Sequence, residues 1–170
     1  MSLPLSQPPP KIALKEQLVL VLSTDLAVRE RAYRAAHDAA TSDEAKPEND
    51  KDTRALEQSY LARGEAVRIE ELRSALAEVQ AMPLRDLGDD EHAALGALVT
   101  TRNTNAGNDG TASFFWLAPH GGGSRLAGGT VQVLTPKSPM GRALLGKSVG
   151  DECEVAVAGT TRALTIVAMR

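Results

Sequence analysis

Two long stretches with a helical pattern, separated by one short break, constrain the fold of this chain more than any other feature. From Lys11 to about Ala40 the sequence contains neither proline nor glycine. Its apolar residues recur at spacings of three and four, which places them on one face of a helix. They are Val19, Leu22, Leu26, Tyr33, Ala36 and Ala40. The apolar side chains on this face become smaller toward Ala40, from Leu and Val to Ala, which would let a partner helix approach closely.

A second helix is predicted from about Thr53 to Ala81, after a polar break at residues 41–52. The break contains Pro47, which cannot continue a helix, and Asn49, which favours turns. Gly64 is a mild flaw in the second helix and costs about 1 kcal/mol relative to Ala. The apolar positions of this helix are Leu56, Tyr60, Leu61, Val67, Ile69, Leu72, Leu76 and Val79.

These two helices predict an antiparallel hairpin. Helices of nearly equal length joined by a short turn bury their seams against each other. We therefore predict a helical hairpin, a coiled coil, over residues 11–83 with its tip at about 41–53. Residues 1–10 are Pro-rich and are predicted to form a flexible tail.

The pattern changes after a polar, acidic segment at residues 84–92, which reads as a linker. Residues 93–170 contain short β-like runs separated by Gly, Asn and Pro. These runs are Ala97–Thr101, Ser113–Leu117, Thr130–Leu134, Glu154–Val157 and Thr161–Val167. One short helix is predicted at about residues 140–145, with Ser138 as N-cap, Pro139 at its first position and Gly146 as its stop. The fold class is therefore α+β, with a mostly antiparallel β domain after the hairpin.

Composition sets bounds on the class of protein. Hydrophobic residues make up 42% and charged residues 24% of the chain, which is typical of folded rather than disordered proteins. Residues 1–92 hold 12 Lys and Arg against 18 Asp and Glu, whereas residues 93–170 hold 7 against 4. An acidic half joined to a basic half is not the pattern of a general nucleic-acid coat.

We expect a cytoplasmic protein that does not enter a membrane. No apolar run approaches the ~20 residues that span a bilayer. The start of the chain lacks the positive charge of a signal or transit peptide. The single Cys153 excludes an intramolecular disulfide and favours a reducing compartment.

Few residues suggest chemistry of the chain's own. His37, His92 and His120 are scattered and have no metal-ligand spacing with Cys153, so no zinc site is predicted. The run from Gly121 to Ser124 lacks the Gly-Lys-Ser/Thr ending of a phosphate loop and is predicted to be a flexible loop between strands. In the aromatic cluster Phe114–Trp116, strand alternation turns Phe115 away from its two neighbours, so the cluster is expected to fill the core on one face.

The segment from Val131 to Val157 is the most informative in the sequence. It reads V-Q-V-L-T-P-K-S-P-M-G-R-A-L-L-G-K-S-V-G-D-E-C-E-V-A-V. The string Ser138–Lys147, followed by Gly150-Asp151 and an alternating strand, closely resembles the C-terminal domain of the Gre-type transcript cleavage factors. In that family this domain resembles the FK506-binding-protein fold without being a working isomerase, and it follows a long helical hairpin.

The resemblance implies a docking role for the start of the short helix. In the family this surface docks on the rim of the secondary channel of bacterial RNA polymerase. By this resemblance the docking residues would be Lys137, Ser138, Pro139 and Arg142. The alternative is that the whole string is a folding signature with no contact role.

The resemblance also implies a role for the hairpin tip. In Gre factors an Asp, and a Glu three residues later, help to hold a second Mg²⁺ in the polymerase active site and orient the water that cuts backtracked RNA. The acidic candidates in this chain are Asp43, Glu44, Glu48 and Asp50. Three residues before Glu48, however, stands Ala45, where the family has its Asp. A solvated acidic turn is the alternative interpretation.

The expected function is therefore regulation of transcription elongation through the polymerase secondary channel. The protein would be an accessory factor with no catalytic residues or cofactor of its own, the Mg²⁺ being shared in the polymerase active site. Its partners would be bacterial RNA polymerase and, indirectly, nascent RNA, with no membrane and no small-molecule substrate. The alternatives are a channel binder that competes with true Gre factors without stimulating cleavage, a peptidyl-prolyl isomerase, and a structural coiled-coil dimer.

Overall fold

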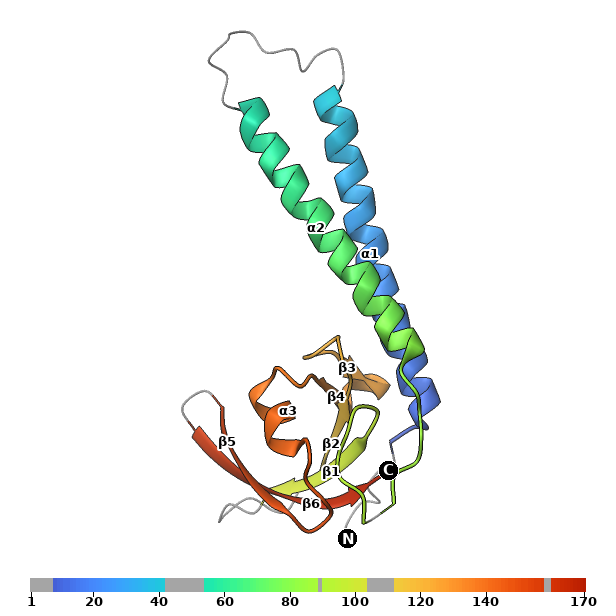
Figure 1. Ribbon diagram of the computed structural model, residues 1–170, viewed down its shortest axis with the longest axis vertical. Coiled ribbons are helices and arrows are strands. Elements are labelled where there is room, and N and C mark those ends of the chain that lie inside the picture. The colour runs from blue at the N-terminus through green and yellow to red at the C-terminus, as the bar shows by residue number, and fades with distance from the viewer. Residues whose placement is uncertain (1–7, 42–53, 89, 104–111, 158–159) are drawn as a thin grey trace. The chain divides into compact units, whose positions relative to one another are not determined.

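The computed structural model describes residues 8–41, 54–88, 90–103, 112–157 and 160–170. Two long helices come first along the chain, and a six-stranded sheet with one short α-helix follows (Figure 1). The predicted α+β class is confirmed. By packing, the described residues divide into a unit drawn from 8–19 and 78–170 and a unit drawn from 20–77.

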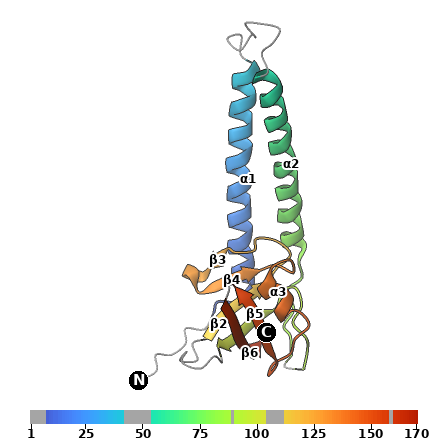
Figure 2. The same ribbon diagram turned by 90° about the vertical axis from the view of Figure 1, so that its left-hand side faces the viewer.

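The two long helices match the predicted ones closely. Helix α1 spans Lys11–Thr41 and helix α2 spans Arg54–Ala81. They run antiparallel side by side in both views (Figures 1 and 2). The predicted tip at 41–53 lies outside the described residues apart from Thr41. Among the helices that the structure describes, none is long and apolar enough to cross a membrane.

The sheet has the strand order β3-β4-β2-β1-β6-β5. Its strands are β1 (Leu98–Asn103), β2 (Ala112–Leu117), β3 (Arg125–Leu126), β4 (Val131–Leu134), β5 (Glu152–Val157) and β6 (Thr160–Met169). Four of the five strand pairs are antiparallel, and β2 with β4 is the parallel pair. The chain returns from β2 to the parallel β4 by way of the two-residue strand β3, which the sequence pattern did not indicate.

From Phe115 to Leu117, strand β2 is buried on both faces of the sheet. Phe115 belongs to the core cluster on the side of helix α3 (Pro139–Leu144), where it packs with residues such as Val99 and Leu144. Its neighbour Trp116 points to the opposite face because side chains alternate along a strand. Trp116 is fully buried there, and its Nε1 donates a hydrogen bond to Gly96 O at 3.3 Å. The aromatic cluster therefore fills core on two faces, rather than on one as its alternation had suggested.

The first turns of α1 belong to the same compact unit as the sheet. Leu14 and Leu18 are fully buried, and both views place this end of α1 beside β3 and β4 (Figures 1 and 2). Gln17 Oε1 accepts a hydrogen bond from Ala127 N at 2.8 Å. A Cβ atom at Gly121 would lie 2.5 Å from Leu18 Cδ1, so the loop contacts the helix through a bare backbone.

The glycine run is consequently a defined turn and not the flexible loop expected from its sequence. Gly121 and Gly123 have φ values of 78° and 89°, which glycine adopts without steric cost. Gly123 N donates to Val133 O at 2.9 Å, and Val133 N donates to Ser124 O at 2.8 Å. The run thus continues the pairing of β3 with β4.

The segment at 84–92 is folded onto the domain, although its polar sequence reads as a linker. Leu87, its buried apolar residue, joins the core cluster on the α3 side. Gly88 N donates to Glu91 Oε2 at 2.8 Å, and Glu91 also pairs with Arg85 at 2.7 Å. The Gly88 N–H, and secondarily Arg85, lower the pKa of Glu91.

The last residues of the predicted tail are also held. Arg170 Nη2 donates to the carbonyl oxygens of Pro8 and Pro9 at 2.7 and 2.9 Å. Lys11 is almost fully buried beside them and donates to Arg85 O. This burial lowers the pKa of Lys11, against the opposing effect of Asp86. Residues 1–7 lie outside the described part of the chain.

Candidate docking surface at the start of the short helix

Helix α3 begins with a complete N-terminal cap. Ser138 has an extended backbone, and its Oγ accepts a hydrogen bond from Gly141 N at 3.0 Å. The same hydroxyl donates to Thr135 O at 2.8 Å. Pro139 follows at the first helical position, where its missing N–H leaves no donor unsatisfied. The Ser-Pro pair therefore fixes where the helix starts, as the sequence predicted.

The glycines of the motif fix how α3 sits on the domain. Gly141 is buried, and a Cβ atom there would collide with Thr135 O. After the buried Leu144, Gly146 turns the chain with a φ of 76°. Gly146 N then donates to Ala93 O at 2.8 Å, which ties the end of the helix to the segment before β1. These residues carry the structural part of the motif.

Three of the four predicted docking residues present their side chains to solvent. Lys137, Pro139 and Arg142 are exposed, whereas Ser138 is half-buried and its hydroxyl is engaged in the cap. Arg142 Nη1 donates to Lys137 O at 2.6 Å. The guanidinium is thereby held near Lys137 at the start of the helix, with its remaining N–H groups available for further bonds. Lys137, Pro139 and Arg142 make up the candidate docking surface.

A turn beyond the end of α3 brings together polar side chains that the sequence motif did not indicate as a group. Asp151 Oδ2 accepts from Ser148 N at 2.8 Å, and His92 Nδ1 lies 2.8 Å from Ser148 Oγ. Ala93 N donates to Lys147 O at 2.7 Å. Gly150 and Asp151 of the motif belong to this turn, in which Asp151 N donates to Ser148 O at 3.1 Å, but nothing in the spacing indicated that His92 meets it.

The tip candidates Asp43, Glu44, Glu48 and Asp50 all lie outside the described residues. Within the described part of the chain, no three His, Cys, Asp or Glu side chains come together in a way that could hold a metal ion.

The face of the sheet under α3 is filled by the protein's own side chains. Met140, Ala143, Leu145 and Val149 pack against a buried cluster that includes Phe115 and Ile166. Cys153 is buried in the same cluster, and its burial raises the pKa of the thiol. This face is therefore a packed core, and the exposed side of α3 carries Pro139 and Arg142 of the candidate docking surface.

Comparison with known proteins identifies the C-terminal part of the chain. Residues 123–170 match the family model described as transcription elongation factor, GreA/GreB, C-terminal. No curated protein sequence matches the chain. The matched residues include the whole of α3 with its cap and the strands β4, β5 and β6.

Solved structures that are similar to the chain include two from Thermus and one from Nitrosomonas europaea. GreA factor homolog 1 of Thermus thermophilus has 22% identity and a TM-score of 0.40, over 89% of this chain and 94% of that chain. Gfh1 of Thermus aquaticus has 19% identity and a TM-score of 0.40, over 88% and 91%. The GreA/GreB factor of Nitrosomonas europaea has 20% identity and a TM-score of 0.37, over 59% and 78%.

The sequence match covers the capped helix, its buried glycine and the turn that follows. Residues 123–170 are therefore similar to the C-terminal domain of the GreA/GreB transcription elongation factors.

Proposed function

We propose that this protein binds bacterial RNA polymerase through the docking surface and regulates elongation through the secondary channel. The observation that carries the proposal is the family match over residues 123–170 together with the exposure of Lys137, Pro139 and Arg142. The buried residues of the same motif are explained by packing. The exposed ones are not, and a basic side chain held at a helix start is well suited to an acidic or polar partner surface.

Binding of core polymerase by the full chain tests the docking surface. The variant Pro139→Ala with Arg142→Glu changes exposed groups and leaves the cap, Gly141 and Leu144 in place. We expect its affinity to fall at least about tenfold, because loss of a central interface Arg commonly costs this much. Arg125→Glu is the matched control, since Arg125 is also exposed and also donates to a backbone carbonyl, that of Gly129. Equal affinities of the two variants would remove the docking assignment.

The action of the tip is a separate part of the proposal. Ala45 stands where the family has its Asp, so the chain lacks one carboxylate of the pair that would hold a second Mg²⁺. A hard cation needs its full set of oxygen ligands in place. We therefore propose that the tip enters the channel, does not complete the metal site, and competes with factors that do.

Backtracked polymerase complexes distinguish this action from cleavage stimulation. Added alone, the protein is expected to leave Mg²⁺-dependent RNA cleavage unchanged. Added with a cleavage-competent Gre factor, it is expected to slow cleavage as its concentration rises. Clear stimulation by the protein alone, lost in Glu44→Ala or Glu48→Ala, would instead support a complete Gre activity.

The packed face under α3 favours polymerase docking over an isomerase. A peptidyl-prolyl isomerase needs an apolar cleft for its substrate. In the described domain, the corresponding face holds Met140, Leu145 and Val149 against the core.

A further inference from the structure

The apolar seam between α1 and α2 is closed only at one end of the hairpin. Buried seam residues on α1 end with Leu22, and those on α2 begin at Ile69. Among the described side chains from Leu26 to Asp38, and again from Glu57 to Arg68, none is buried. Leu61 is 74% exposed. Fully buried apolar side chains therefore do not hold the two helices together in this distal part.

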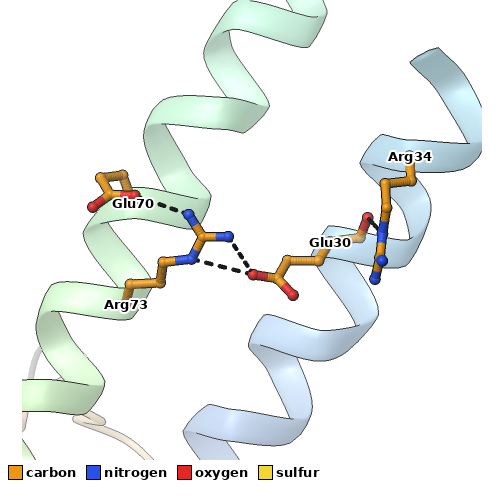
Figure 3. A network of polar contacts seen from close by, with 4 residues as sticks. All are labelled: Glu30, Arg34, Glu70 and Arg73. Carbon is orange, nitrogen blue, oxygen red and sulfur yellow. Dashed lines mark hydrogen bonds and ion pairs between the residues drawn. The ribbon is translucent and has the colours of Figure 1, made fainter.

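Two ion pairs of opposite polarity join the helices at the point where the buried seam ends. Arg73 of α2 donates to Glu30 of α1 from Nη2 at 2.5 Å and from Nε at 3.2 Å (Figure 3). Arg29 of α1 donates to Glu65 of α2 from Nη1 at 3.3 Å. Arg29 and Glu30 are thus neighbours on α1, whereas their partners Glu65 and Arg73 lie eight residues apart on α2.

The two ion pairs use α2 residues on either side of the buried Ile69, four positions before it and four after it. Residues 65, 69 and 73 lie on one face of α2 because they are spaced by four. A cavity of about 430 Å³ adjoins this point, lined by apolar residues at Tyr33, Ala66 and Ile69 and by charged ones at Glu30, Arg34, Glu70 and Arg73. The helices are therefore bridged by long charged side chains where their apolar side chains do not fill the space between them.

Each Arg is also fixed from within its own helix. Arg73 Nη1 donates to Glu70 Oε2 at 3.1 Å, so its guanidinium lies between two carboxylates (Figure 3). Arg29 Nε donates to Asp25 Oδ1 at 3.1 Å. Glu30 and Glu65 each retain 28% side-chain exposure, less than their Arg partners. An isolated exposed ion pair contributes little to stability, but an Arg that donates to two carboxylates within a network contributes more.

We propose that Arg29, Glu30, Glu65 and Arg73 form a polar clamp that closes the distal half of the hairpin. They are positioning residues. If the hairpin enters the polymerase channel, as the proposed function requires, the clamp holds together the two helices that carry the tip there. The opposite polarity of the two pairs also fixes the alignment of the helices. A slip that brought Arg29 to Arg73, or Glu30 to Glu65, would place like charges together.

Hydrogen exchange of the full-length free protein, followed by mass spectrometry, tests the clamp. Glu30→Lys and Arg73→Glu each place like charges across the helices and preserve helix propensity. We expect backbone amides of residues 26–38 and 62–74 to exchange about two- to fivefold faster, the scale of an exposed ion pair. Residues 11–19 and the sheet should be unchanged, which shows within the same sample that the variant is folded.

The charge-swapped double variant separates a direct pair from general weakening of either helix. Glu30→Lys with Arg73→Glu should exchange more slowly in the distal segments than either single variant. Arg31→Glu is the control, because Arg31 is exposed and its Nε donates to Ala27 O of its own helix. Equal exchange in the parent and both single variants, or a double variant faster than both, would overturn the clamp.

A polymerase experiment distinguishes failure of the clamp from failure of the proposed function. The single variants should retain affinity for polymerase, since the docking surface is unchanged, and should lose at least half of their inhibition of Gre-stimulated cleavage. If exchange responds as expected and inhibition does not, the clamp stands and the channel role of the hairpin falls.

Discussion

At the scale of single residues, the GreA/GreB-type motif divides into groups that shape the domain and groups that meet solvent. Ser138 uses its hydroxyl for the cap, Gly141 lets the helix approach Thr135, and Leu144 is buried. Pro139 and Arg142 remain exposed. The sequence could predict the cap and the helix start because both follow from local chemistry. That Ser138 would be half-buried could not be predicted, because it depends on the chain at Thr135.

Gly141→Ala tests the packing half of this division. Because a Cβ atom at residue 141 would collide with Thr135 O, the helix or the preceding turn must shift. Overpacking of this kind costs about 1–3 kcal/mol, and we expect the upper end because the obstructing atom belongs to the backbone. Chemical denaturation measures the loss. A variant as stable as the parent would mean that α3 does not lie against Thr135.

The pH dependence of stability tests the Gly88–Glu91 turn. The Gly88 N–H lowers the pKa of Glu91 from the ordinary value of a glutamate, so the folded state favours the carboxylate. A lowered acid pKa contributes stability above the unfolded value, and this contribution is lost as pH falls through the folded value. The stability difference between the parent and Glu91→Gln should therefore be full above about pH 4.5 and shrink below it. Denaturant midpoints between pH 3 and 6 measure it, and a constant difference would contradict the prediction.

At the scale of elements, the long helices and most strands follow from the sequence, and the exceptions have physical causes. Absence of proline, together with apolar spacing, indicated α1 and α2. Strand β3 has two residues and so carries no alternation that a pattern could reveal. The segment at 84–92 contains one buried anchor, Leu87, within polar residues, and its composition therefore resembled a linker. In each exception, packing against distant residues outweighed the local pattern.

Gly64→Ala tests how far intrinsic helix propensity limits α2. No heavy atom lies within 4 Å of a Cβ placed at residue 64, so the substitution adds no clash. Replacing a helical glycine by alanine stabilises by about 1 kcal/mol, mainly by restricting the unfolded chain. We expect slower hydrogen exchange in residues 57–75 and no change in the sheet. This variant also serves as the matched control for Gly141→Ala, because the same substitution should act in opposite directions at the two positions.

At the scale of the whole molecule, the compact units do not coincide with hairpin and β domain. The unit that contains the sheet also contains residues 8–19 and the end of α2 from Glu78. Lys15 Nζ donates to Met82 O at 2.7 Å, and His120 Nε2 lies 2.9 Å from Glu78 Oε2 within this unit. A sequence pattern can show where a helix begins and ends, but it cannot show that one helix contributes to two packing units.

Two shortened chains test this division. A chain in which residues 20–77 are replaced by a connection of about six residues, a length usual between helices, keeps Leu14 and Leu18 with the sheet. A chain that lacks residues 1–85 loses both leucines, each worth about 1.5–3 kcal/mol when fully buried. We expect the first to unfold cooperatively and to keep its buried Cys153 unreactive toward thiol reagents, as burial and the raised pKa of the thiol require. The second should melt at a lower temperature and react faster. If both are equally stable and equally protected, the first turns of α1 are not part of the core that the sheet needs.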